Sequence, residues 1–174
     1  MTTVASPRID PERLIARLAQ LGEIGGLAGG GCARLALTDA DRAGRDLVVA
    51  WMRDLGLAVT VDAVGNVVAT RPGREPGPPV MMGSHIDTVQ TGGLYDGNLG
   101  VLAGLEVLEA LAVAGVTTRR ALAVAFFSDE EGARFAPDMA GSLAYAGGLS
   151  AEAAHDLAGI DGSRYGDELA RIGY

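Results

Sequence analysis

Hydrophobic positions in the first third of the chain recur at helical spacing in two stretches. In the first stretch, Asp10 and Pro11 form an N-cap and a first-turn proline. The second starts at Thr38, which precedes Asp41 in a capping pattern, and runs through residue 55 to a stop at Gly56. Both stretches are predicted to be helices. The first is expected to carry its apolar residues on one face, namely Leu14, Ile15, Leu18 and Leu21.

From residue 57 onward the pattern becomes that of strands separated by turn residues. Residues 57–71 predict two strands around Gly65-Asn66, and a Pro-rich surface loop follows. Residues 79–85 predict a buried strand, residues 99–115 an apolar helix and residues 119–128 a further strand. Strand, helix and strand in this order predict a βαβ unit, and short helices with glycine turns are expected from Pro137. The sequence therefore predicts one layered α/β domain over residues 1–174, with some strands lacking.

Composition restricts the kinds of partner and the compartment. The net charge of −8 disfavours nucleic acid and anionic membranes as partners. A single cysteine, Cys32, excludes an intramolecular disulfide and agrees with a reducing cytoplasm. No apolar stretch reaches transmembrane length, and residues 1–10 lack the basic and apolar regions of a signal peptide. We therefore expect a cytoplasmic protein that binds neither nucleic acid nor membrane.

Candidate chemistry begins where the strand at 79–85 ends. His85 and Asp87 are two residues apart, so in extended backbone both lie on one face. Because a metal-bound imidazole commonly donates its other N–H to a carboxylate, we interpret His85 as a metal ligand and Asp87 as the residue that orients it. Asp96 lies in a glycine-rich loop before the apolar helix, where its two oxygens are suited to bridging two cations.

Three consecutive acids follow the next apolar strand. Acids at the end of a buried strand need charge compensation, and metal cations are a source of it. Adjacent residues on a strand point in opposite directions, so Glu130 and Glu131 are not both expected to bind metal. One of them binds metal while the other takes a proton from the attacking water. The spacing alone does not say which residue has which role.

Each of these features has a common alternative explanation. A lone histidine after a strand is often a hydrogen-bonded structural residue, and a run of acids is often a solvated loop. The glycine-rich stretch is also typical of turns. What favours a dinuclear metal site is the conjunction of metal-binding side chains at three element ends, as expected at the rim of an α/β sheet.

At these residues the chain resembles the M20-type metal-dependent amidohydrolases. The similar branch holds the N-carbamoyl-L-amino acid hydrolases, β-ureidopropionases and allantoate amidohydrolases. The resemblance runs from Gly31 to the C-terminus and includes the segments RLALTDADRAGRDLVVAWM, VDAVGNVVA, GSHIDTVQTGG, YDGNLGVLAGLEVL and DEEGARFAPDMAGSLAYAGG. The two signatures GSHxDT and EEGxRF together are far more specific than either alone.

The resemblance implies a role for each candidate residue. His85 would bind one of two divalent metal ions, and Asp96 would bridge both. Glu131 would bind the second ion, Glu130 would be the general base, and Asp87 would orient His85. A mixed set of histidine and carboxylate ligands suits Zn²⁺ and Mn²⁺ about equally well.

The chain departs from that family in its length. Members are longer and carry a His-x-Glu segment and a further C-terminal histidine as metal ligands, together with an inserted dimerising lid domain. Because the chain begins with Met1 and stops at LARIGY, we expect it to be the N-terminal part of the catalytic domain, C-terminally incomplete and without the lid. The other histidine, His155, lies in a different sequence context and is not expected to replace a ligand.

The resemblance also implies a reaction. It predicts hydrolysis of a non-peptide C–N bond in N-carbamoyl amino acids or related ureido acids, with a homodimer for the full-length family. The alternative is an inactive fragment, or one that works only when another polypeptide supplies the missing histidines and lid. An M20-type metallopeptidase is a minor alternative, because EEGARF and AGSLAYAGG resemble the carbamoyl branch more closely.

Overall fold

The computed structural model describes residues 6–174; residues 1–5, on which the signal-peptide prediction partly rests, lie outside the described residues. Two N-terminal helices form where they were predicted. Helix α1 spans Pro11–Glu23, and the Asp10 carboxylate accepts hydrogen bonds from two N–H groups of its first turn. Helix α2 spans Asp39–Asp54, and the Thr38 hydroxyl accepts from the N–H of Asp41. Both side chains satisfy donors that a helix start leaves without a partner.

Four strands form one mixed sheet in the order β1-β2-β4-β3. They span Ala58–Val61 (β1), Val67–Arg71 (β2), Val80–His85 (β3) and Leu122–Phe127 (β4). β1 and β2 form an antiparallel hairpin, as predicted, with Gly65 at a φ of 79° in its turn. β2 pairs with β4 antiparallel, and β3 pairs with β4 in parallel. The parallel pair is the predicted βαβ unit, because its connection contains a long helix.

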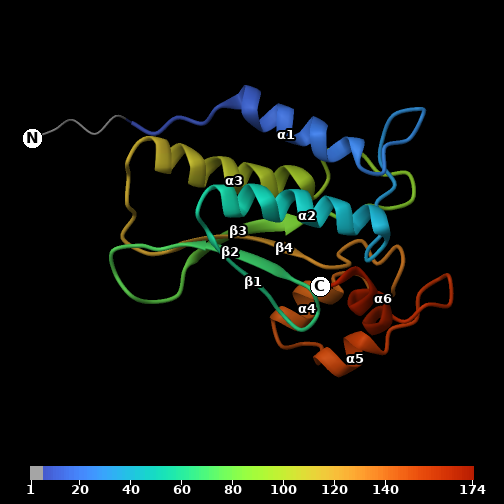
Figure 1. Ribbon diagram of the computed structural model, residues 1–174. Coiled ribbons are helices and arrows are strands. Elements are labelled where there is room, and N and C mark those ends of the chain that lie inside the picture. Colours follow the sequence, from blue (N-terminus) through green and yellow to red (C-terminus); the bar gives the residue numbers. More distant parts are fainter. Residues whose placement is uncertain (1–5) are drawn as a thin grey trace, which may run out of the picture.

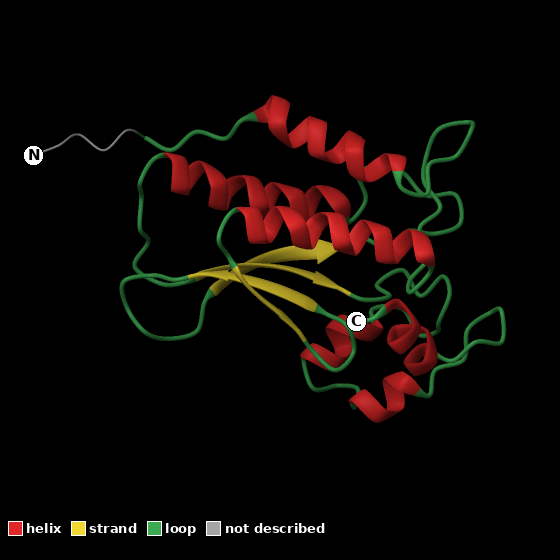
Figure 2. Cartoon of the chain, in the orientation of Figure 1, coloured by secondary structure: helices red, strands yellow, loops and turns green. Residues whose placement is uncertain are grey.

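The longest helices cover one face of the sheet (Figure 1). Helix α3 spans Asn98–Val113 and packs on β3 and β4, and α1 lies on α3 and α2 as an outer layer. The short helices span Ala140–Tyr145 (α4), Ala151–His155 (α5) and Tyr165–Ile172 (α6), and they gather near the end of the sheet toward which β3 and β4 run (Figure 2). Within residues 6–174, no helix combines the length and the apolar run that a membrane crossing requires.

Two apolar clusters form the core. The larger lies between the sheet and helices α1 to α3, where strand β4 is buried over most of its length because it has a neighbour on each side. The smaller joins the segment before α2 to α5 and α6. Its buried residues are Ala36, Leu37, Val64, Phe135, Ala154, Tyr165, Leu169 and Ile172. The C-terminal segment therefore packs on the body of the domain through its own apolar contacts.

Burial differs from the sequence pattern in two places. Ile15 belongs to the apolar face of α1 but is 63% exposed, because α1 contacts its neighbours along a narrower stripe that includes Leu18 and Leu21. The strand at 79–85 was expected to be buried, but β3 is an edge strand in which only His85 is buried. An edge strand has one neighbour, so its side chains are covered less than those of a central strand.

Candidate functional site

The candidate residues meet where two parallel strands end side by side. His85 is the last residue of β3 and pairs in register with Phe127, the last residue of β4. Asp96 lies in the loop that leads into α3, and Glu130 follows β4. The sequence brings these together because both strands of a βαβ unit point the same way and the crossover helix starts at the same rim.

His85 is buried and its ring is fixed by the main chain. Its Nδ1 lies 2.9 Å from the carbonyl oxygen of Asp87. A carbonyl oxygen only accepts, so Nδ1 carries a hydrogen and donates it. The other ring nitrogen, Nε2, lies 3.8 Å from Oδ1 of Asp96 and 3.3 Å from Oε2 of Glu130. The ring therefore directs Nε2 at two carboxylates from two different segments.

The structure brings some of the predicted ligands together and leaves one further away. Within the described chain, the carboxylates that lie within 4 Å of a His85 ring nitrogen are those of Asp87, Asp96 and Glu130. Glu131 follows Glu130 but is outside that distance. Among residues 6–174, no group of three or more histidine, cysteine, aspartate or glutamate side chains is arranged to hold a metal ion. The residues present supply donors of the right type but not a complete set.

Asp87 has two contacts that differ from those expected. It lies beyond the end of β3, so it does not share a strand face with His85, and it contacts the ring closely through its carbonyl oxygen. Its carboxylate accepts hydrogen bonds from the N–H groups of Glu130 and Glu131, each at 3.3 Å. Burial, and next the charge of Asp41, raise the pKa of this carboxyl to about 6. Asp87 therefore links the two strand exits.

The acids after β4 lie in a turn and not on a strand. The strand ends at Phe127, and Asp129 has a φ of 51°, which breaks the extended path. The expectation that Glu130 and Glu131 point to opposite faces of a strand was therefore wrong, because a left-handed residue precedes them. Their side chains are set by the turn and by the hydrogen bonds from their N–H groups to Asp87.

The site gathers more carboxyl groups than its neighbours pair. Asp129 is fully buried, and within the described residues both of its carboxylate oxygens lack a hydrogen-bond partner. Burial, and next the charge of Asp87, raise its pKa to about 8. Burial and the nearby acids Asp96 and Glu130 also raise the pKa of Glu131. A divalent cation is the kind of group that such an excess of carboxylates would favour.

Two buried arginines support this site, and the sequence analysis did not identify them. Arg34 donates to the segment after β3, from its main-chain N–H to the Thr88 hydroxyl and from Nε to the carbonyl oxygen of Ile86, each at 2.8 Å. Arg45 donates to Asp41 at 2.7 Å and to the hydroxyl of Ser128 at 3.0 Å. The spacing of Asp41 and Arg45, four residues apart on the buried face of α2, was a usable signal for the second. Nothing local in the sequence marks the first.

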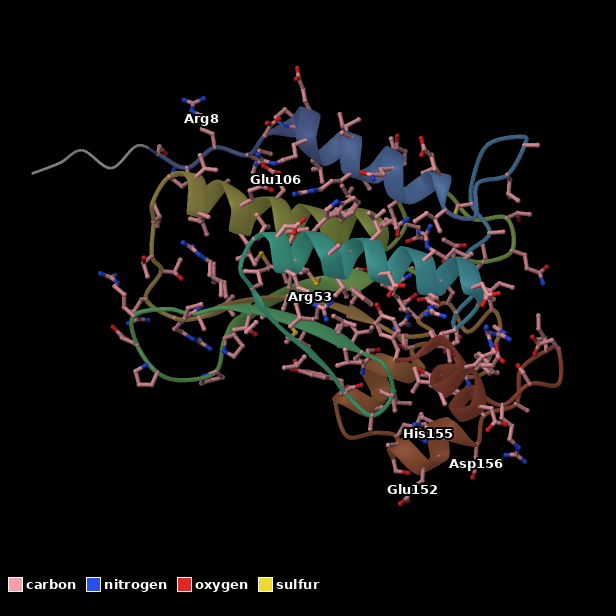
Figure 3. The ribbon with its side chains drawn as sticks, in the orientation of Figure 1. Arg8, Arg53, Glu106, Glu152, His155 and Asp156 are labelled. Atoms are coloured by element: carbon pink, nitrogen blue, oxygen red, sulfur yellow. The ribbon has the colours of Figure 1, made fainter. Side chains whose placement is uncertain are left out.

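The other histidine lies elsewhere in the fold. His155 ends α5, and Figure 3 places it among the short C-terminal helices. Its Nε2 is 2.7 Å from the carbonyl oxygen of Ala63, in the turn between β1 and β2. This contact joins α5 to the turn between β1 and β2 and gives His155 a role in packing.

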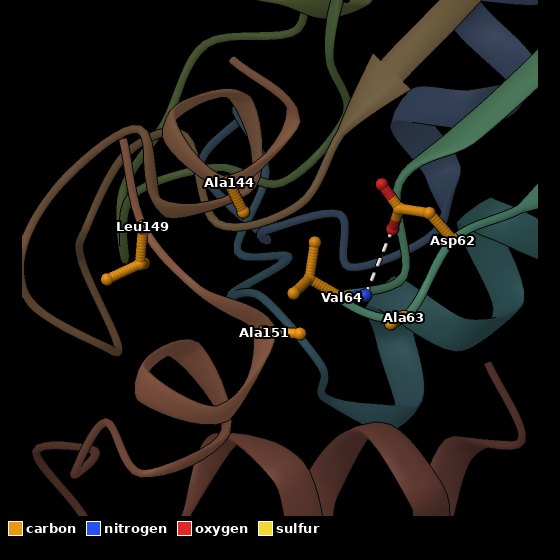
Figure 4. Close-up of a pocket in the computed structure, with 6 residues that line it drawn as sticks. All are labelled: Asp62, Ala63, Val64, Ala144, Leu149 and Ala151. Atoms are coloured by element: carbon orange, nitrogen blue, oxygen red, sulfur yellow. Dashed lines mark hydrogen bonds between the residues drawn. The ribbon is translucent and has the colours of Figure 1, made fainter. Parts of the chain in front are cut away.

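A pocket of about 160 Å³ lies beside the turn between β1 and β2 (Figure 4). The titratable group in its wall is Asp62, whose carboxylate already accepts hydrogen bonds from Val64 and Asn66. The remaining lining is apolar, from Ala63, Val64, Ala144, Leu149 and Ala151. This pocket offers no reactive group, so the strand exits remain the candidate site.

Several known proteins resemble this chain in sequence. The chain is 43% identical over 168 residues to an N-carbamoyl-L-amino-acid amidohydrolase of Rhizobium meliloti. That alignment covers 96% of this chain and 40% of that protein. It is 38% identical over 144 residues to allantoate deiminase 1 of Glycine max, covering 81% of this chain and 30% of that protein. Both alignments include a large part of the chain but a minor part of the relative.

The fold of this chain is also similar to that of a solved structure. An amidase of the hydantoinase/carbamoylase family from Burkholderia vietnamiensis superposes with a TM-score of 0.95 at 45% identity, over 97% of this chain and 41% of that chain. The chain thus spans about 40% of the length of these proteins and holds part of their fold. The sequence model of peptidase family M28 matches residues 66–164, more than half of the chain. The chain therefore belongs to peptidase family M28, in the M20-like group that the sequence predicted, with relatives named as N-carbamoyl-L-amino acid amidohydrolases and allantoate deiminases.

Proposed function

We propose that this chain carries part of the active site of a metal-dependent hydrolase that cleaves a non-peptide C–N bond of N-carbamoyl amino acids or related ureido acids. The observation that carries the proposal is the convergence of His85 Nε2 on the carboxylates of Asp96 and Glu130 at two paired strand ends. The names of the relatives support the reaction class. For the whole protein we further propose a homodimer in the cytoplasm.

The donor set fits two divalent cations, Zn²⁺ or Mn²⁺, in type. His85 offers Nε2, since Nδ1 is occupied by the carbonyl oxygen of Asp87, and Asp96 offers a carboxylate 3.8 Å from Nε2. Glu131 offers a further carboxylate on the turn after β4, more than 4 Å from the ring nitrogens. The buried carboxyl group of Asp129, which has no hydrogen-bond partner among the described residues, supports a site that binds cations. When bound, such cations supply Lewis-acid activation of a water and of the scissile carbonyl. The set is incomplete within this chain, so further ligands would come from outside it.

Glu130 is the residue we assign as general base. Its side chain is 35% exposed, and its carboxylate faces the open rim of the site beside His85 Nε2. A carboxylate in that position takes a proton from the attacking water and passes it to the leaving nitrogen. Asp87 holds the main chain of Glu130 in place through its hydrogen bond to the N–H group. Glu130 thus transfers the proton, and Asp87 positions Glu130.

The test uses a chimera, because the chain spans 40% of its relative. Residues 1–174 replace the matching part of the Rhizobium meliloti protein, and hydrolysis of N-carbamoyl-L-amino acids is measured. We expect turnover that Glu130→Gln lowers by ~10²–10⁴-fold, since that is the usual loss of a positioned base. Glu152→Gln, an exposed acid on α5, is the matched control and should leave turnover unchanged. A folded, metal-loaded chimera without turnover contradicts the proposal.

The isolated chain tests the fragment alternative. We expect weak binding of Zn²⁺ or Mn²⁺ in calorimetry, lost in His85→Ala, and little or no turnover. Steady hydrolysis by the 174-residue chain, abolished by Glu130→Gln, would show that no complementing polypeptide is needed. A metallopeptidase is the second candidate, because the matching family is named for peptidases. Turnover of a dipeptide in preference to an N-carbamoyl amino acid would favour it.

A further inference from the structure

Gly97 packs its main chain against one face of the His85 ring. It follows Asp96 directly, and the N–H of Asn98 donates to the carbonyl oxygen of Asp96 at 2.6 Å, which makes Gly97 the centre of a tight three-residue turn. The φ and ψ of Gly97 are 63° and −53°. A Cβ at this position would lie 2.5 Å from Cε1, Nδ1 and Nε2 of His85 alike. The glycine therefore lets the turn touch the flat side of the imidazole.

The ring is buried and is also held on its other side. His85 is 4% exposed, and its Nδ1 is held 2.9 Å from the carbonyl oxygen of Asp87. The residue between them, Ile86, is itself held through its carbonyl oxygen by the guanidinium of Arg34. The imidazole is thus enclosed by the exit of β3 and by the turn at Gly97. A real Cβ contact under 3 Å is sterically excluded, so a side chain at 97 would displace the ring.

We propose that Gly97 is a positioning residue whose bare main chain holds the His85 ring against the Asp87 carbonyl oxygen and so aims Nε2 at Asp96 and Glu130. Since Gly97 is bonded to Asp96, the same turn sets the place of both predicted metal ligands. This inference rests on the proposed function for its biological meaning. The geometric part concerns this chain alone and is testable without metal or substrate.

The first test separates the ring contact from backbone strain. Alanine at 97 is strained in any background, because its φ is in the region that favours glycine. Unfolding by denaturant is therefore measured for Gly97→Ala, His85→Ala and the double variant. We expect Gly97→Ala to lower the folding equilibrium constant by roughly tenfold or more, and His85→Ala to recover a clear part of that loss. If Gly97→Ala does not fold, the double variant should.

Gly115 provides the matched control. Its φ is 66°, and a Cβ there would meet nothing within 4 Å. Gly115→Ala should lower stability by the same factor with and without His85. Equal losses from Gly97→Ala in the two backgrounds, or a double variant that stays unfolded while Gly115→Ala folds, would overturn the proposal.

The second test observes the ring itself. Long-range ¹H–¹⁵N correlation spectra of the chain identify which imidazole nitrogen carries the hydrogen. We expect the His85 signals of the unsubstituted chain and of Gly115→Ala to show hydrogen on Nδ1, and those of Gly97→Ala to shift as the bond to Asp87 is lost. Unchanged His85 signals in folded Gly97→Ala contradict the proposal. Because no substrate is involved, failure of hydrolysis in the chimera leaves this result unaffected.

Discussion

The exits of β3 and β4 are each supported by a buried arginine, but the two arginines have different partners. Arg34, at the exit of β3, donates to main-chain carbonyl oxygens and to the side chain of Asn98. Among residues 6–174, no carboxylate forms an ion pair with it, and burial lowers its pKa. At the exit of β4, Arg45 is paired with Asp41 at 2.7 Å. Burial opposes its charge, but Asp41 raises the pKa of Arg45 overall.

The two arginines therefore hold the segments at the strand exits in two different ways. Arg34 donates hydrogen bonds to several carbonyl groups that would otherwise be buried without partners. Arg45 acts both as a donor to the Gly65 carbonyl oxygen and the Ser128 hydroxyl and as the counter-charge of a fully buried acid. Loss of Arg34 leaves neutral groups unsatisfied, whereas loss of Arg45 leaves a buried charge as well. The two should therefore respond differently to substitution.

The largest effect is expected for Arg45→Met. The substitution leaves Asp41 as an uncompensated buried carboxylate, which should lower the free energy of unfolding by ~3–5 kcal/mol. Denaturant unfolding measures this loss. Adding Asp41→Asn removes the stranded charge, so the double variant should be more stable than Arg45→Met alone. A double variant whose loss equals the sum of the single losses would show that the ion pair is not the reason for the effect.

A smaller effect is expected for Arg34→Lys. The ammonium group keeps the charge but has three donors and no planar fork, so some of the carbonyl oxygens around Arg34 lose their partner. We expect a loss of ~1–3 kcal/mol in the free energy of unfolding. Arg53→Lys, an exposed site on α2, is the control and should change stability by less than ~0.5 kcal/mol. Equal stabilities of the two variants would show that the hydrogen bonds of buried Arg34 contribute no more to stability than a surface arginine does.

A third buried arginine, Arg134, and the exposed Arg171 extend the comparison to pH. Hydrogen bonds from Arg171, and secondarily from Arg134, hold the pKa of Glu168 below its ordinary value. Since the folded pKa is depressed, the stabilisation is present above the unfolded pKa and is lost as pH falls through the folded value. We expect the chain to lose up to ~1 kcal/mol relative to Glu168→Gln as pH falls below about 4.5. Parallel stability curves of the two proteins from pH 3 to pH 7 would contradict this.

Local sequence signals determined the helices and the hairpin. The Asp10 and Thr38 caps act within three residues of themselves, so the starts of α1 and α2 follow from neighbouring residues alone. Gly65 supplies the positive φ of the turn between β1 and β2 in the same way. The apolar runs of α3 and β4 gave the βαβ unit, and with it the rim where His85, the glycine-rich loop and the acidic turn meet.

Tertiary structure decided what depends on distant partners. Arg34 donates hydrogen bonds to Ile86 and Asn98, which are 52 and 64 residues away in the sequence. Its burial and its partners could therefore not be predicted from neighbouring residues. The edge position of β3 depends on which strands are its neighbours, and the exposure of Ile15 depends on how α1 lies on the other helices. The sequence by itself determined which residues have side chains of the types that bind metal or transfer a proton. Which ring nitrogen of His85 faces the acids was decided by the Asp87 carbonyl oxygen and the turn at Gly97, because orientation requires contacts that form only on folding.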